Sequence, residues 1–248
     1  MSLFDIYKSN VITDYSLIQY NDNMFRFVVR NIKYNDNTQK KGLSLTTSNN
    51  SNILRSKRKV RELALSNDFE YFVTLTVSPL FCDRTDLDII ISALRKYLKK
   101  YKRKHEDFAY ILIAEKHKDG SSYHFHGLMK GIDKEDIYKN KMGYNSCYFF
   151  DDIGFNSFSK IQSLERVSNY ITKYITKDLC KTSSGHSYFC SRGLVRPTVT
   201  HYMPFGIDEL IKCTYKNDYC RIFDFDINTL NKKDLYKLLY TLNKYKTE

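Results

Sequence analysis

A histidine pair on a short β-rich run is the first feature of this sequence that could do chemistry. His124 and His126 stand on either side of Phe125 in the run SYHFHGLMKG, and alternate residues of a β-strand point to the same face. The two imidazoles therefore project together, while Phe125 points to the opposite side and into the core. Two imidazoles so placed are able to bind one divalent cation and leave coordination positions open. Such a pair is also common at ordinary core or surface positions, so further ligands are needed.

A carboxylate is the expected third ligand. Glu115 ends the preceding run FAYILIAE, and Asp119 with Gly120 in the connection KHKDGS is typical of a hairpin turn. Such a hairpin would bring Glu115 opposite the histidine pair. Two nitrogens and one carboxylate oxygen suit Mn²⁺ or Mg²⁺ and do not exclude Zn²⁺ or Fe²⁺. The alternative is an exposed carboxylate paired with Lys116 or Lys118.

A four-residue unit is written twice, as YITKYITK at 170–177. At 3.6 residues per turn of a helix, Tyr170 and Tyr174 share a face, with Lys173 and Lys177 beside them. Tyrosine is a weak nucleophile at its ordinary pKa of about 10, so its attack needs nearby cations and a polarised phosphate. The alternative is a plain amphipathic helix edge, because the chain contains 21 tyrosines.

The elements around these residues predict an α+β fold with a central antiparallel β-sheet flanked by helices. Strands are expected at 71–78, 108–115, 122–131 and 147–153, and helices at 51–67, 87–107, 133–141, 164–180 and 227–246. This order is typical of a split βαβ, ferredoxin-like or RRM-like sheet with its helices on one face. We also expect a polar loop at 35–52 and an extended segment at 189–199.

The charge of the chain favours a polyanionic partner. Lys and Arg number 40 against 28 acidic residues, a net charge of +12, and each cation that meets a phosphate releases a condensed counterion. Two predicted helices concentrate this charge, and their candidate DNA-binding residues are Arg55, Lys57, Arg58, Lys59 and Arg61 in the first and Lys99, Lys100, Lys102 and Arg103 in the second. The alternative is that these are solvated helix faces.

Membrane and secretory classes are not indicated. No apolar run approaches the roughly 20 residues that cross a bilayer. The first residues, MSLFDIYKSN, lack the basic and apolar regions of a signal peptide, and the six cysteines form no CxxC pair. We therefore expect a cytoplasmic protein with no membrane partner, and the composition rich in Asn, Lys, Ile and Tyr favours a bacterial host cell.

Together these motifs resemble the HUH endonuclease superfamily, in particular the replication initiators of small single-stranded DNA phages and plasmids. The run FVTLT at 72–76 is similar to the first motif of that family, HFH at 124–126 to its histidine motif, and YITKYITK to its tyrosine motif. Two tyrosines four residues apart resemble the two-tyrosine class, which includes the microvirus gene A and filamentous-phage gene II proteins. The run SRGLVRP at 191–197 is similar to a segment after the tyrosine helix.

The resemblance implies a rolling-circle replication initiator, a site-specific nuclease and ligase of single-stranded origin DNA. It implies that His124, His126 and Glu115 bind Mg²⁺ or Mn²⁺, that Tyr170 and Tyr174 are the nucleophiles, and that Lys173 or Lys177 assists. A 5′-phosphotyrosine would then be the intermediate. No Walker A motif is present, so a host helicase would act with a DNA polymerase.

Alternatives inside and outside the superfamily stay open at this point. They are a conjugative relaxase, a single-strand transposase, another HxH metalloenzyme and a non-catalytic DNA-binding protein. Of the remaining histidines, His105, His117, His186 and His201 follow no recognisable ligand pattern. The expected organisation is a polar N-terminal segment at 1–50, the nuclease domain at 51–200 and a C-terminal extension at 201–248 that ends in a helix.

Overall fold

The chain divides into two compact units. The computed structural model describes residues 11–33, 45–117, 120, 122–176, 188–202, 207, 210–217 and 220–245. Leu43–Val195 form one unit, here the central unit; Met1–Gly42 and Arg196–Glu248 form the other, here the terminal unit. The two ends of the chain thus share a unit, where the sequence predicted an N-terminal segment and a separate C-terminal extension. The reason is pairing between strands almost 200 residues apart, which no local pattern reveals.

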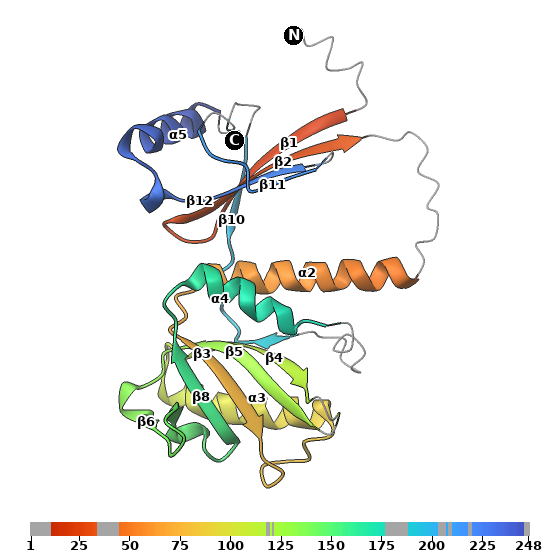
Figure 1. The fold of residues 1–248 in the computed structure, drawn as a ribbon, viewed down its shortest axis with the longest axis vertical. Helices are drawn as coiled ribbons and strands as arrows, with labels where there is room; N and C mark the ends of the chain where they lie inside the picture. The colour runs from red at the N-terminus through yellow and green to blue at the C-terminus, as the bar shows by residue number, and fades with distance from the viewer. Residues whose placement is uncertain are drawn as a thin grey trace. The chain divides into compact units, whose positions relative to one another are not determined.

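A five-stranded antiparallel sheet forms the middle of the central unit, in the order β8-β3-β5-β4-β9 (Figure 1). The strands are β3 (Tyr71–Val77), β4 (Ala109–Lys116), β5 (Tyr123–Lys130), β8 (Gly154–Lys160) and β9 (Phe189–Cys190). The predicted α+β class, an antiparallel sheet flanked by helices, is confirmed. Three of the predicted strands recur as β3, β4 and β5 with shifts of one residue at most.

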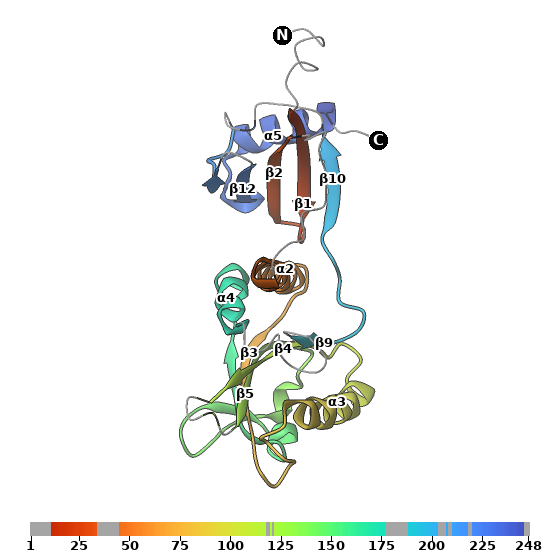
Figure 2. The same ribbon diagram turned by 90° about the vertical axis from the view of Figure 1, so that its right-hand side faces the viewer.

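In the described part of the central unit, three helices cover the sheet. They are α2 (Leu45–Leu65), α3 (Leu87–Lys104) and α4 (Leu164–Ile171), which continues into the 3₁₀ turn η3 (Thr172–Tyr174). The side chain of Asp86 caps α3 by accepting hydrogen bonds from two backbone N–H groups, and three basic residues in its last turn complement the helix dipole. The helix α2 lies beside α4 (Figures 1 and 2).

The helices lie on both faces of this sheet, so the expectation of one covered face is wrong. Helix α3 runs behind the strands in Figure 1. From this helix the Arg95 guanidinium lies over the ring of Phe189 in β9. On the opposite face, Tyr170 of α4 contacts Phe72, and Tyr174 of η3 stacks on His126. The sequence pattern misled because the tyrosine helix buries few of its own residues: only Ser168 and Ile171 are buried in α4.

Several other predictions are corrected. The expected loop at 35–52 is helical from Leu45, and residues 34–44 lie outside the described residues. The expected helix at 133–141 is a 3₁₀ turn, η1 (Lys134–Asp136), followed by β6 (Ile137–Lys139), which pairs with β7 (Asn145–Cys147). Backbone pairing across that hairpin outweighs the weak helical preference of a short segment.

The fourth predicted strand is shifted along the chain. Residues 147–153 hold the end of β7 and the 3₁₀ turn η2 (Tyr148–Phe150), and the strand that completes the sheet is β8. Gly154 begins β8 with a φ of +136°, and a Cβ there would meet the Thr76 carbonyl oxygen at 2.4 Å. Only glycine allows this close approach, a requirement that the sequence pattern does not disclose.

The terminal unit is a second antiparallel sheet in the order β10-β1-β2-β12-β11. Its strands are β1 (Val11–Gln19), β2 (Met24–Lys33), β10 (Thr198–Tyr202), β11 (Tyr215–Lys216) and β12 (Cys220–Asp226). Leu238 and Leu242 of α5 (Lys232–Tyr245) complete its core beside Phe27 and Phe223. The predicted final helix at 227–246 corresponds to the 3₁₀ turn η6 (Ile227–Thr229) and α5. No helix of the described part of the chain is long and apolar enough to span a bilayer.

Candidate functional site

Strand β5 holds the histidine pair on one face of the central sheet, and the neighbouring strand orients both rings. Thr76 lies opposite His124, and Thr74 lies opposite His126. The Thr76 hydroxyl oxygen is 3.0 Å from His124 Nδ1, and the Thr74 hydroxyl oxygen is 3.2 Å from His126 Nδ1. Partners of this kind at Nδ1 fix the ring orientation and leave Nε2 for a ligand. Between the two histidines, Phe125 is fully buried on the other face.

Glu115 lies directly across from His124 in the β4–β5 register. Its carboxylate oxygen Oε2 is 2.8 Å from His126 Nε2. Burial lowers the pKa of His126, while the hydrogen bond and the charge of Glu115 act in the opposite direction. The predicted hairpin connects the two strands and Gly120 adopts a φ of +74°, whereas Asp119 lies outside the described residues.

His117 also reaches this face, although its spacing in the sequence gave no signal. It follows β4 by one residue, and its backbone N–H donates to the Ser122 carbonyl oxygen, which extends the hairpin pairing. The rings of His117 and His124 are 3.4 Å apart between centroids, and His117 Nε2 is buried with no hydrogen-bond partner among the residues that the structure describes. Its position two residues beyond Glu115, on the same face of the hairpin, is the signal that could have found it.

The donor set has the chemistry that a divalent cation requires. Two donor atoms at 2.0–2.2 Å from one cation and at a right angle lie about 3 Å apart, which matches the separation between His126 Nε2 and Glu115 Oε2. Two imidazoles on one cation have centroids about 5 Å apart, whereas those of His124 and His126 are 6.3 Å apart. Within the described residues no group of three or more His, Cys, Asp or Glu side chains is arranged to hold a metal ion.

The two tyrosines meet directly above this face. The predicted continuous helix at 164–180 ends at Ile171, and η3 tightens the chain so that Tyr174 turns over the sheet. The Tyr174 ring stacks on the His126 ring with 3.9 Å between centroids. The Tyr174 hydroxyl donates to the Tyr170 hydroxyl at 2.8 Å. The two phenol oxygens therefore lie next to each other beside the histidine pair.

The surroundings of the two phenols differ. Burial raises the pKa of Tyr174, and the hydrogen bond to Tyr170 raises it further. Tyr170 is 43% exposed, its oxygen accepts the hydrogen bond, and Lys173 Nζ lies 4.9 Å from the centroid of its ring. Tyr170 is consequently the more accessible of the two to an incoming phosphate. Lys177, the other predicted lysine, lies outside the described residues.

The candidate DNA-binding residues fall into two groups. On α2, Arg58 and Lys59 both lie near Glu62, and Arg61 donates to the Asn169 side chain of α4, next to Tyr170. Arg55 is exposed and Lys57 is partly exposed. On α3, the exposed residues are Lys99, Lys100, Lys102 and Arg103. Only the α2 group lies on the helix layer of the tyrosines; the α3 group lies on the other side of the sheet.

Comparison with known proteins bears on this unit. Residues 70–179 match the model of a family of replication-associated proteins, described as the ORF2 and gene II protein type. This segment is similar to replication-associated proteins. The match runs from β3 past the tyrosine motif and so spans every candidate catalytic and metal-binding residue, and it supports a protein of the rolling-circle replication type. Searches of the curated proteins and of the solved structures gave no match.

Proposed function

We propose that the central unit nicks and rejoins single-stranded origin DNA and thereby initiates rolling-circle replication. The observation that carries this proposal is the pair of phenol oxygens, 2.8 Å apart, held over a histidine whose Nε2 contacts a carboxylate. Two phenols, candidate metal-binding donors and the Lys173 ammonium lie on one face of the sheet, which supports the proposal. That combination suits phosphoryl transfer, in which positioning and charge stabilisation provide most of the rate.

The reaction is a transesterification. The Tyr170 oxygen attacks the scissile phosphorus, the bond from phosphorus to the 3′-oxygen breaks, and the phenol proton is lost as the 3′-hydroxyl gains one. The product is a 5′-phosphotyrosine, so the free energy of the phosphodiester is retained and rejoining requires no ATP. When bound, Mn²⁺ or Mg²⁺ supplies the charge that polarises the scissile phosphate. His124, His126 and Glu115 would hold it, and Lys173 offsets the charge on the phosphate oxygens.

The second tyrosine permits a second transfer at the same place. In the structure the Tyr174 hydroxyl donates a hydrogen bond to the Tyr170 oxygen. Once Tyr170 carries DNA, Tyr174 would act as the nucleophile. After one round of synthesis the Tyr174 oxygen attacks the regenerated origin phosphate and the bond to its 3′-oxygen breaks. The 3′-hydroxyl set free attacks the phosphotyrosine at Tyr170, which releases the completed strand as a circle and restores the Tyr170 phenol. The two-tyrosine assignment, the dependence on a host helicase and DNA polymerase, and a location in the bacterial cytoplasm are all parts of this proposal.

A covalent adduct tests the proposal directly. Incubation with single-stranded origin DNA and Mn²⁺ should give a protein–DNA adduct that EDTA prevents. Tyr170→Phe and Tyr174→Phe should each form an adduct at a reduced rate, and the double variant none. Mass spectrometry of the linked peptide should recover both positions. A double variant that still forms the adduct would contradict the assignment, and no adduct with any variant would favour a non-catalytic DNA-binding protein.

If one single variant forms no adduct and the other forms it at nearly the rate of the unaltered protein, the enzyme uses one tyrosine. Because Tyr170 is the more exposed phenol, it should then be the essential one. Ile171→Val, a neighbouring change that keeps the buried stripe of α4, is the matched control and should leave adduct formation close to that of the unaltered protein.

A further inference from the structure

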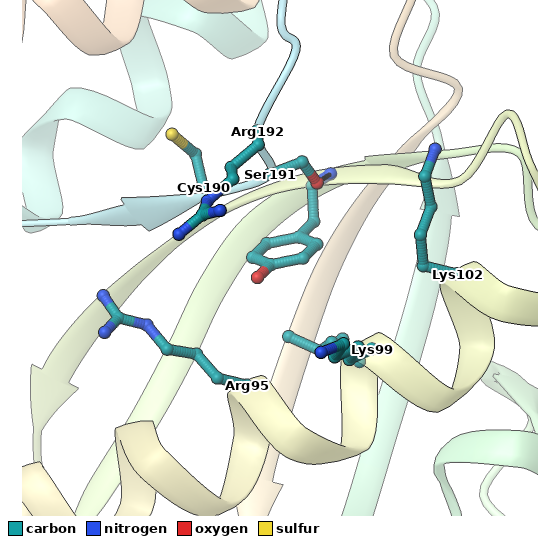
Figure 3. Close-up of a pocket in the computed structure, with 8 residues that line it drawn as sticks. Arg95, Lys99, Lys102, Cys190, Ser191 and Arg192 are labelled. Atoms are coloured by element: carbon teal, nitrogen blue, oxygen red, sulfur yellow. Dashed lines mark hydrogen bonds between the residues drawn. The ribbon is translucent and has the colours of Figure 1, made fainter.

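A cationic cleft lies on the face of the central sheet opposite the histidines. It has a volume of 570 Å³ and lies between α3 and the segment that begins with β9 (Figure 3). Its lining consists of four basic side chains, a tyrosine, a serine, a cysteine and a leucine, and no acidic residue is among them. A volume of this size falls within the range of ligand sites.

The four cations are arranged to meet a row of phosphates. Arg95, Lys99 and Lys102 lie four and three residues apart on α3, so they share one stripe about 10 Å long. Figure 3 shows them rising from the helix, with Arg192 reaching toward them from the other wall. Successive phosphates of one strand are at least about 3.4 Å apart, so a stripe of about 10 Å can meet two or three of them. Among the residues that the structure describes, no carboxylate forms an ion pair with any of the four.

The wall that carries Arg192 is held in place. The Ser191 hydroxyl accepts a hydrogen bond from the Tyr110 backbone N–H at 2.9 Å, and the Ser191 N–H donates to the Tyr110 carbonyl oxygen at 3.0 Å. Arg95 also lies over the Phe189 ring, 5.8 Å from its centroid. These contacts order the cleft before any ligand arrives, which reduces the entropic cost of binding. Tyr110 itself lines the cleft and offers an aromatic surface of the kind on which bases stack.

We infer that this cleft binds the sugar–phosphate backbone of the same DNA strand at a distance from the scissile phosphate. Tyr110 and Glu115 are five residues apart on β4, about 17 Å, and they point to opposite faces of the sheet. One phosphate therefore cannot occupy both sites. A DNA strand that occupies both sites must go around the edge of the sheet, which the short β-strand β9 forms. The assignment of the strand as the substrate rests on the proposed function, whereas the presence of an anion site does not.

The test measures how tightly the protein binds single-stranded DNA under conditions in which no nicking occurs. Fluorescence anisotropy with a labelled 30-nucleotide single strand is measured in EDTA with the Tyr170→Phe/Tyr174→Phe protein as background, so neither metal nor adduct contributes. Arg95→Gln/Lys99→Gln should raise the dissociation constant about tenfold and reduce the slope of log affinity against log salt by about 1.4. Arg192→Gln, on the other wall, should reduce the slope by about 0.7.

The matched control removes the same charge from the same helix outside the cleft. Lys96→Gln/Lys104→Gln changes two exposed lysines that do not line it and should alter the dissociation constant less than threefold. Equal losses in the two double variants would overturn the inference and leave α3 a generally cationic surface. Displacement of the strand by micromolar pyrophosphate or deoxynucleotide would also overturn it and assign the cleft to a small anion. Thermal melting of each variant excludes unfolding as the cause.

The length of the strand separates this inference from the proposed function. For nicking, the cleft and control substitutions are made in the protein that keeps both tyrosines, with Mn²⁺ present. An oligonucleotide that covers only the nick site should be nicked equally by the two variants, while a 30-nucleotide strand should be nicked more slowly by the cleft variant at limiting concentration. If no protein nicks but the difference in binding persists, the cleft stands and the proposed function fails. If nicking is normal and the cleft variant binds like the control, the cleft inference alone fails.

Discussion

The two faces of the central sheet are built from the same strands and present different kinds of side chain. On one face β3, β4 and β5 present Thr74, Thr76, Glu115, His124 and His126, and on the other they present Val73, Leu75, Leu112, Phe125 and Gly127. The first set is polar and partly exposed, and the second is buried in the core that α3 covers. Alternation along a strand thus lets adjacent residues carry chemistry and stability separately. A substitution should affect one or the other according to the face it occupies.

Removal of both histidines should have the largest effect on the polar face. His124→Ala/His126→Ala should abolish nicking while most DNA binding remains, because affinity depends mainly on phosphate contacts. The free energy of unfolding should fall by about 1–2 kcal/mol, because the contacts of the two rings with Thr74, Thr76 and Glu115 are lost while neither side chain belongs to the apolar core. A gel assay of nicking and a urea titration measure the two quantities. Nicking by this variant in EDTA would rule out the metal site.

Truncation of Phe125, which lies between the two histidines, should lower stability rather than the nicking activity of the folded protein. Phe125 is completely buried, so Phe125→Ala should lower the free energy of unfolding by about 3–5 kcal/mol. Activity should fall only as the folded population falls, which a comparison of nicking at two temperatures detects. Phe125→Leu keeps more of the volume and serves as the milder control. A loss of nicking with full stability would show that the faces are not independent.

The threonines that orient the imidazoles should show an intermediate effect. Thr74→Val/Thr76→Val keeps the shape of both side chains and removes the hydroxyl contacts to Nδ1. We expect Mn²⁺ affinity to fall about 10- to 100-fold, as is usual when the partners of metal-binding histidines are removed. Isothermal titration calorimetry measures this without any reaction. Thr85→Val, in the loop before α3, is the control and should leave the affinity unchanged.

The smallest expected effect is on the protonation of His126. Because burial lowers its pKa, the ring should titrate below pH 6.5 in an NMR experiment on the metal-free protein. Between that lowered pKa and 6.5 the unfolded chain binds a proton that the folded chain does not, so the free energy of unfolding should decrease as the pH falls through this window. Glu115→Gln should lower the pKa further, because the charge of Glu115 raises it. A pKa above 6.5 would show that the charge of Glu115 outweighs burial.

The histidine motif and its strand were predictable because a period of two residues is local information. The same holds for α3, whose apolar stripe, Asp86 cap and basic last turn all lie within one segment. The threonines illustrate the limit. FVTLT could be assigned as a strand from its residues, but its hydroxyls acquire a role only through the register with β5. The missed strand β8 has the same origin, since GFNSFSK is polar at most positions and is identified as a strand by its pairing with β3.

The sequence by itself determined which residues are candidates for chemistry and which local elements carry them: an alternating histidine pair, a carboxylate one hairpin away and a repeated tyrosine unit. Only the tertiary structure decided how they meet. It set Tyr174 on the His126 ring, added His117 beside His124, placed α3 on the face away from the histidine pair, and joined the two ends of the chain in one sheet. The physical reason is that periodicity is a property of a few successive residues. Register, stacking and the pairing of distant strands depend on the free energy of the whole packed core.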